Sequence, residues 1–408
     1  MQKQIYTLAA TLLALSLLRS ATAPEWGFFG HRRINRMAVF TLPPEMMVFY
    51  KQHIEYITEH AVDPDKRRYA TKYEAPRHYI DIDRWDVYPF ERVPRNWTDA
   101  LRQYTDVYYV TAARDTVHLF GNEVMQAEGD FLQSASGVIV EQRAYRNFFY
   151  DSVLPQYYEE NWQVSCDSLA QLIGYELDCK TAFAVDRFTE HGVLPYHLLR
   201  MQDYLTEAFR ERNPARVLRL SAEIGHYIGD AHVPLHTTEN YNGQLTDQVG
   251  IHAFWESRLP ELYADERYDF FVGKPIYIEN PKEYFWDMVL DSHQLLDSVL
   301  LIEKELSQTF PEDHQYCYEE RLGLTVRTQC EAYARAYHER MQGMVERRMR
   351  DAIHAIASSW YTAWVDAGQP DMHDLNAKAD APWVDAEGEE IEEVYQEGSA
   401  KGRRDGGG

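Results

Sequence analysis

The sequence predicts an all-α protein, and three observations indicate this class. Apolar residues recur every three or four positions from about Glu331 to Val365, which is the period of an amphipathic helix. The stretches YHLLRMQDYLTEAFRERN and ARVLRLSAEIGHYIGD share this spacing and are joined at Asn213–Pro214, which indicates a turn between two helices. Continuous alternation of apolar and polar residues, the pattern of a half-buried strand, is scarce.

Residues 331–365 are expected to form one long helix that Gly368 and Pro370 end. Its methionines and tryptophans are expected to pack in the core rather than to line a binding groove. The two segments around Asn213 are expected to form a helix, a turn and a second helix.

The chain is expected to begin with a signal peptide at residues 1–23. Lys3 precedes the apolar run LAATLLALSLL, and the following SATA ends in an Ala-x-Ala cleavage pattern. The apolar run is too short to span a bilayer, and no other transmembrane segment is predicted. The mature protein is therefore expected to be secreted or periplasmic.

Residues 24–374 are expected to form a single α-helical domain with a large insertion at about 86–186. The insertion is expected to hold helices and loops and carries no motif of recognisable chemistry. Residues 375–408 are acidic, rich in glycine and poor in large apolar groups, so they predict an acidic disordered tail.

The charge of the chain excludes one class of protein. The formal net charge is −24, so the chain lacks the basic face of a protein that holds nucleic acid by phosphate contacts alone. Any phosphate chemistry must recruit positive charge locally, most simply from metal ions. Hydrophobic residues make up 45 %, which favours a packed globular protein.

Four cysteines fit an oxidising compartment. Cys166 and Cys179 lie thirteen residues apart, as do Cys317 and Cys330, so two local disulfides are expected. Four cysteines permit three connectivities, and all three stay open at this point. Zinc ligation by thiolates is not expected because the chain contains no Cys-x-x-Cys motif.

The clearest chemical signal lies in residues 221–261. His226 and Asp230 are four apart, so on a helix both side chains project from one face and can bind one cation. His252 and Glu256 repeat this spacing, and His236 lies between the two pairs after a proline turn. Nitrogen and carboxylate ligands without sulfur suit zinc, so a zinc cluster is predicted.

These motifs resemble a known superfamily. HYIGDAHVPLH followed by GIHAFWE is similar to the metal-binding core shared by bacterial zinc-dependent phospholipases C and fungal single-strand-specific nucleases. WGFFGH, HAVDPD and HYIDID supply further ligand types in the expected order. The chain is thus identified as a secreted bacterial member, and the resemblance implies an all-α zinc-dependent hydrolase domain with a trinuclear zinc site.

The resemblance implies a role for each ligand residue. One zinc is expected to bind Asp63, His78, His226 and Asp230. A second is expected to bind His236, His252 and Glu256. The third would use His31, the other oxygen of Asp230, and the amino and carbonyl groups of Trp26. Asp63 and Asp230 are in addition expected to be catalytic.

Two of these ligands have alternatives. Asp65 is the rival to Asp63, and the family's spacing of about fifteen residues before His78 favours Asp63. The Ala-x-Ala pattern would leave two residues ahead of Trp26, so either cleavage falls just before Trp26 or the third site is weakened. His232 is expected to support the site or to lie exposed, and His60 to orient Asp63 or to lie on the surface.

The resemblance implies hydrolysis of phosphodiesters by zinc-activated water, with up to three zinc ions as cofactors. The substrate is expected to be a phospholipid head group or single-stranded nucleic acid, and no stable protein partner is inferred. In the nuclease case Tyr79 would stack on a base and Asp81 would bond its edge, although Tyr79 equally fits the core. A secreted zinc-binding or surface interaction protein without catalysis is the alternative.

Overall fold

The computed structural model describes residues 28–321, 324–379, 390–392, 394–395 and 401. Its α-helices are α2 (Phe28–Val39), α3 (Pro44–Gln52), α4 (Ile54–Glu59), α5 (Asp63–Arg67), α6 (Trp97–Tyr104), α7 (Gln142–Phe148), α8 (Cys166–Ile173), α9 (Leu194–Arg210), α10 (Pro214–Ala231), α11 (Ile251–Ala253), α12 (Leu259–Arg267), α13 (Pro281–Gln294), α14 (Leu296–Thr309), α15 (Glu331–Arg340), α16 (Met344–Asp366) and α17 (Met372–Ala379). Short 3-10 turns are η1 (His60–Val62), η2 (Ala75–Arg77), η3 (Ile82–Arg84), η5 (Leu154–Gln156), η6 (Thr189–His191), η7 (Pro234–Thr237) and η9 (Glu312–His314). Two π-helical turns are η4 (Phe149–Val153) and η8 (Phe254–Arg258).

The prediction of an all-α fold is wrong. Of the residues that the structure describes, 59 % are helical and 12 % are in strands, which makes this a mixed α/β protein. The strands are β1 (Thr105–Val110), β2 (Thr116–Phe120), β3 (Met125–Glu128), β4 (Phe131–Ser134), β5 (Ile139–Glu141), β6 (Trp162–Val164), β7 (Thr181–Asp186), β8 (Tyr316–Arg321) and β9 (Leu324–Gln329). They form three small antiparallel sheets, in the orders β2-β1-β7-β6, β3-β4-β5 and β8-β9. Each strand is only three to six residues long, so an alternating pattern hardly develops in the sequence.

The helical body is built around α10. Helices α2, α9 and α16 pack against it, and every residue of α10 from Leu220 to Ala231 is buried. Gly225 allows α2 to approach, since a Cβ there would lie 2.1 Å from Oδ1 of Asn35. The amide of Asn35 donates to the carbonyl oxygen of Ala222 at 2.9 Å. This packing fixes α2 relative to α10, and both helices carry predicted ligands. Asn213 caps α10, because its side chain accepts a hydrogen bond from the backbone N–H of Arg216 at 3.1 Å.

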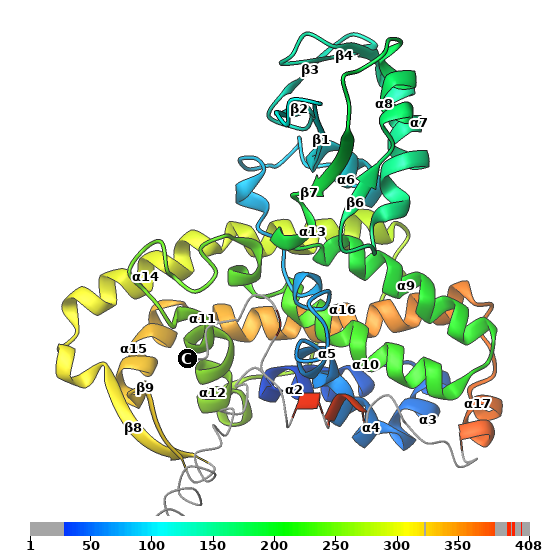
Figure 1. Cartoon of the computed structure of the whole chain (residues 1–408). Coiled ribbons are helices and arrows are strands. Elements are labelled where there is room, and N and C mark those ends of the chain that lie inside the picture. The colour runs from blue at the N-terminus through cyan, green and yellow to red at the C-terminus, as the bar shows by residue number, and fades with distance from the viewer. Residues whose placement is uncertain (1–27, 322–323, 380–389, 393, 396–400, 402–408) are drawn as a thin grey trace, which may run out of the picture.

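The expected insertion holds a second hydrophobic core. Its buried residues run from Leu101 to Ala184 and include Phe120, Tyr145 and Leu169. Strands β1 and β7 pair from Thr105↔Asp186 to Val110↔Thr181 and close this segment across about eighty residues. Figure 1 shows its sheets and helices α7 and α8 standing out from the helical body.

Both expected disulfides form between neighbours in the sequence. Cys166 pairs with Cys179, and Cys317 pairs with Cys330 at the base of the β8-β9 hairpin. The structure thereby selects one of the three connectivities. Two disulfides are typical of proteins from an extracellular or otherwise oxidising compartment.

The expected long helix at 331–365 is interrupted. It divides into α15 and α16, because Gln342 and Gly343 adopt positive φ angles of 51° and 78°. Left-handed backbone ends a right-handed helix, and glycine adopts it without steric cost. The methionines and tryptophans of this region, including Met341 and Trp360, are buried in the main core as predicted.

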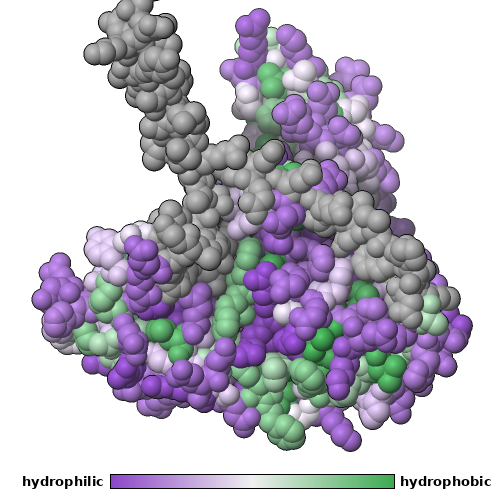
Figure 2. All heavy atoms as spheres, turned by 90° about the horizontal axis from the view of Figure 1, so that it is seen from below, coloured by the Kyte–Doolittle hydropathy of each residue, from purple (hydrophilic) through white to green (hydrophobic). Residues whose placement is uncertain are grey.

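The predicted signal peptide and Trp26 lie outside the described residues, as does most of the predicted disordered tail. Where the tail is described, it contacts the body: Ile391 and Tyr395 are buried, and Glu392 lies 2.9 Å from the amine of Lys66. In the part of the chain that the structure describes, no helix is long and apolar enough to cross a membrane. The face in Figure 2 is mainly hydrophilic with smaller apolar patches, which agrees with the acidic composition.

Candidate metal centre

Helix α10 places His226 and Asp230 one turn apart in the interior. Their side chains are 0 % and 1 % exposed, and Nε2 of His226 lies 3.3 Å from Oδ2 of Asp230. The other ring nitrogen of His226, Nδ1, donates to the carbonyl oxygen of Ala61 at 2.8 Å. This bond leaves Nε2 of His226 with a lone pair, so this nitrogen and the carboxylate of Asp230 can bind the same cation.

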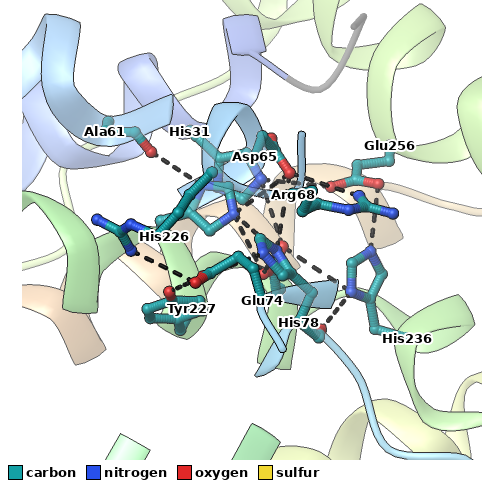
Figure 3. Close-up of polar contacts among 12 residues, drawn as sticks. His31, Ala61, Asp65, Arg68, Glu74, His78, His226, Tyr227, His236 and Glu256 are labelled. Carbon is teal, nitrogen blue, oxygen red and sulfur yellow. Dashed lines mark hydrogen bonds and ion pairs between the residues drawn. The ribbon is translucent and has the colours of Figure 1, made fainter. Parts of the chain in front are cut away.

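Asp65 and His78 complete a first ligand group around His226. Nδ1 of His78 lies 3.0 Å from Nε2 of His226 and 3.0 Å from Oδ2 of Asp230. Oδ1 of Asp65 lies 3.6 Å from the same nitrogen of His226 and 3.7 Å from Nδ1 of His78. These side chains come from three chain segments and converge in Figure 3.

His31 of α2 forms a second group with His226 and Asp230. Its Nε2 lies 3.4 Å from Oδ1 of Asp230 and 3.5 Å from Oε1 of Glu256. Its ring stacks on that of His226 with the centroids 3.8 Å apart. Asp230 therefore faces His78 and His226 with one oxygen and His31 with the other.

His236, His252 and Glu256 form a third group. Nε2 of His252 lies 3.1 Å from Nε2 of His236 and 2.8 Å from Oε2 of Glu256. The Nδ1 atoms of both histidines face backbone carbonyls, those of His78 at 2.6 Å and Tyr241 at 3.1 Å. Glu256 is the most accessible member, with 15 % of its side chain exposed, so the centre is most open at this group.

The donor atoms fit metal ions. Because Nδ1 of His236 and of His252 donates to a carbonyl, the neutral rings present the lone pairs of both Nε2 atoms to each other at 3.1 Å, an arrangement that a metal ion between them, or a proton on one ring, would stabilise. Ligands at about 2.0–2.1 Å in a tetrahedron lie about 3.3 Å apart, close to the separations seen here. Nδ1 of His31 is buried with no hydrogen-bond partner among the described residues. The three buried groups could therefore each hold a metal ion.

Burial and the neighbouring charges shift the pKa values of the histidines in the centre. Burial lowers the pKa of His31, but contacts with Asp230 and Glu256 outweigh burial and raise it to about 10. Burial likewise lowers the pKa of His78, whereas Asp230 and Glu74 raise it to about 9. Burial and the charge of His31 lower the pKa of His226 to about 4. Without a metal ion, protons on His31 and His78 balance the carboxylates, and an ion that binds there must displace them.

The structure places Asp65 among the histidines of the centre, whereas the sequence favoured Asp63. Asp65 joins a ligand group, whereas Oδ2 of Asp63 lies 2.6 Å from Nδ1 of His60 and Oδ1 lies 3.5 Å from the amine of Lys66. The two aspartates are two residues apart on α5 and so point to different sides of the helix. His60 contacts Asp63, which is one of the two roles expected for it.

Three further residues lie in the interior. Tyr79 is 2 % exposed and its hydroxyl donates to the carbonyl of Glu190 at 3.0 Å, so it packs in the core. Asp81 is 4 % exposed and lies 3.2 Å from Nδ1 of His191. His232 is buried outside the three groups, and its Nδ1 donates to the carbonyl of Ile228 at 2.7 Å.

Arg68 and Glu74 are parts of the centre that the sequence did not indicate. Arg68 is 4 % exposed, with Nη1 3.6 Å from Oδ1 of Asp65, and Figure 3 shows its side chain near Glu256. Glu74 faces the ring nitrogen of His78 that points away from Asp230, with its Oε1 3.6 Å from Nε2 of that ring. The spacing of Arg68 three residues after Asp65 is a signal that could have found it.

No protein-family model matches the chain, and no curated protein matches it significantly. The resemblance to phospholipases C and single-strand-specific nucleases therefore stays a prediction that rests on its quoted motifs.

Replacing Gly229 with alanine is expected to weaken metal binding by about tenfold, because it displaces His31. The added Cβ would lie 2.9 Å from Nδ1 of His31 and 2.7 Å from Cδ1 of Ile34. The isoleucine methyl can turn away, whereas the imidazole has to shift. We also expect a loss of about 1–3 kcal/mol in stability from overpacking. Metal titration and thermal unfolding measure the two effects.

Gly225→Ala is the matched control for Gly229→Ala. Its Cβ would overpack the same helix pair against Asn35 and would displace no predicted ligand. A fall in metal affinity of equal size in both variants would contradict the role given to Gly229.

Proposed function

We propose that the chain is an exported zinc-dependent phosphodiester hydrolase of phospholipase C or single-strand nuclease type. The proposal is supported by three ligand groups that lie next to one another. Two of them share His226, and Glu256 of the third lies 3.5 Å from His31. A lone structural site would need only one such group. Donors of nitrogen and oxygen without sulfur support zinc as the metal.

Each of the three ligand groups would supply the residues that hold one zinc ion. Asp65, His78 and His226 would hold one zinc, and His236, His252 and Glu256 a second. His31 and Asp230 would hold a third, with Trp26 as a proposed additional ligand. Bound zinc would supply the Lewis acidity that activates water and neutralises the charge of the phosphodiester.

The chain's own side chains support this chemistry in two ways. Asp230 holds the groups close together, since its two oxygens face different histidines. The buried guanidinium of Arg68 beside Asp65 is positioned to donate hydrogen bonds to an anionic oxygen that approaches the centre. With zinc bound, the positive charges of the ions and of Arg68 would outweigh the carboxylates of Asp65, Asp230 and Glu256 and attract an anion, although the net charge of the chain is −24.

The burial of Tyr79 bears on the choice of substrate. Base stacking on Tyr79 is not supported, because this ring is 2 % exposed.

Secretion or export of the mature protein is supported by the two disulfides and by the signal pattern in the sequence.

The proposal is tested by hydrolysis assays on zinc-loaded protein that begins at Trp26. Single-stranded DNA and phosphatidylcholine vesicles are compared side by side, each with and without a chelator. We expect turnover of one of them that the chelator abolishes and added zinc restores. Bound zinc with no cleavage of either substrate, or of a chromogenic phosphodiester, would instead favour the non-catalytic zinc-binding alternative.

A further inference from the structure

We infer that Glu74 is a positioning residue that fixes the ring of His78 so that Nδ1 rather than Nε2 faces the metal centre. The inference rests on the proposed function only through the metal ions and does not depend on which phosphodiester is cleaved. It concerns a buried carboxylate outside the ligand groups.

His78 is oriented differently from the other ligand histidines. His226, His236 and His252 each face the centre with Nε2, and their Nδ1 atoms bond to backbone carbonyls. His78 instead directs Nδ1 at Asp230 and His226. Its outer nitrogen, Nε2, therefore needs a different partner.

Glu74 occupies the position of that partner. Its Oε1 lies 3.6 Å from Nε2 of His78, one helical turn earlier in the chain, and the side chain of Glu74 is 0 % exposed. This is an ion-pair distance rather than a hydrogen bond. A carboxylate there favours the tautomer with the proton on Nε2, which leaves Nδ1 of His78 as the electron-pair donor.

A set of polar groups holds Glu74 in place. Arg77 donates from Nη1 to Oε2 at 2.7 Å, and Nη1 of Arg67 lies 3.6 Å from the same oxygen. The hydroxyl of Tyr227 donates to Oε1. Two guanidiniums keep the buried carboxylate charged, so it can polarise the imidazole of His78.

The same network supplies a control residue. Glu223 of α10 pairs with Arg67 and is also buried, at 7 % exposure. Its side chain bonds to Arg67, and it belongs to none of the three ligand groups that the described residues form. Glu223→Gln therefore removes one buried charge from the network without touching the orienting contact.

The test compares zinc affinity in the full chain, measured by competition with a chromophoric chelator and without substrate. We expect Glu74→Gln to lower the affinity by about 10–100-fold and to reduce the rise in melting temperature on zinc binding. Glu223→Gln is expected to lower the melting temperatures of the zinc-free and zinc-loaded forms alike and to leave the affinity unchanged. Unchanged affinity in Glu74→Gln, or an equal fall in both variants, would overturn the inference.

A second variant decides the matter if Glu74→Gln does not fold. Tyr227→Phe removes the hydroxyl that bonds Oε1 of Glu74 and keeps every charge. We expect a fall of several-fold in zinc affinity, and a wild-type affinity would overturn the inference in that case. Because no readout involves hydrolysis, a failure of the proposed enzymatic function is distinguishable from a failure of this role for Glu74.

Discussion

Replacing His226 with alanine is expected to remove metal and hydrolytic activity together. His226 belongs to two of the three ligand groups, is 0 % exposed, and faces the centre with a nitrogen that carries no proton when Nδ1 donates to Ala61. We expect at least one metal ion fewer per chain and an activity lower by at least about 10²–10³-fold. Elemental analysis of the purified variant and a phosphodiester assay measure the two losses.

The control for His226→Ala is His232→Ala. His232 is also buried and lies six residues further on, but its ring bonds to the carbonyl of Ile228 and it belongs to none of the three ligand groups. Both substitutions delete a buried side chain, which costs about 2–5 kcal/mol, so both should lower the melting temperature. A His226→Ala variant that keeps its full metal content and activity would refute the assignment of the centre.

Asp65→Asn is expected to abolish activity while Asp63→Asn retains it. An amide is a weaker ligand than a carboxylate, and only Asp65 lies among the histidines of the first group. We expect Asp65→Asn to lose one metal ion and at least about 10²-fold in turnover. Asp63→Asn should keep the metal content and lose stability only through its contacts with His60 and Lys66.

Comparing Asp65→Asn with Asp63→Asn tests whether the structure or the sequence spacing identifies the metal ligand correctly. Both substitutions remove one negative charge from α5 and change the side-chain volume equally. If Asp63→Asn lost the metal ion and Asp65→Asn kept it, the spacing of fifteen residues to His78 would be the correct guide.

Four ligands of the centre could be predicted directly from the sequence because they come in short helical spacings, whereas His31 and His78 were indicated only by the family resemblance. His226 and Asp230, and likewise His252 and Glu256, lie four apart, which brings them together wherever the local chain is helical. The choice between Asp63 and Asp65 could not be made in this way. It depends on how the five-residue helix α5 is rotated, and tertiary contacts decide that rotation.

The missed strands have a different cause. Strand β1 pairs with β7 across about eighty residues, and both have only six residues, so their stability comes from pairing and from the second core rather than from local pattern. The break between α15 and α16 could have been found, because Gly343 interrupts the predicted helix. Glu74 and Arg68 were missed although their partners His78 and Asp65 lie within four residues of them, because charge pairs at such spacings are usually exposed and the burial of these two comes from tertiary packing.

We propose that the three ligand groups hold zinc ions next to one another. The most direct measurement is a crystal structure of the protein that begins at Trp26, with anomalous difference density recorded on both sides of the zinc absorption edge. We predict edge-dependent peaks at the group of Asp65, His78 and His226 and at the group of His236, His252 and Glu256, with the third beside His31. Zinc-loaded crystals with no peak at these groups, or with zinc bound only elsewhere, would contradict the account.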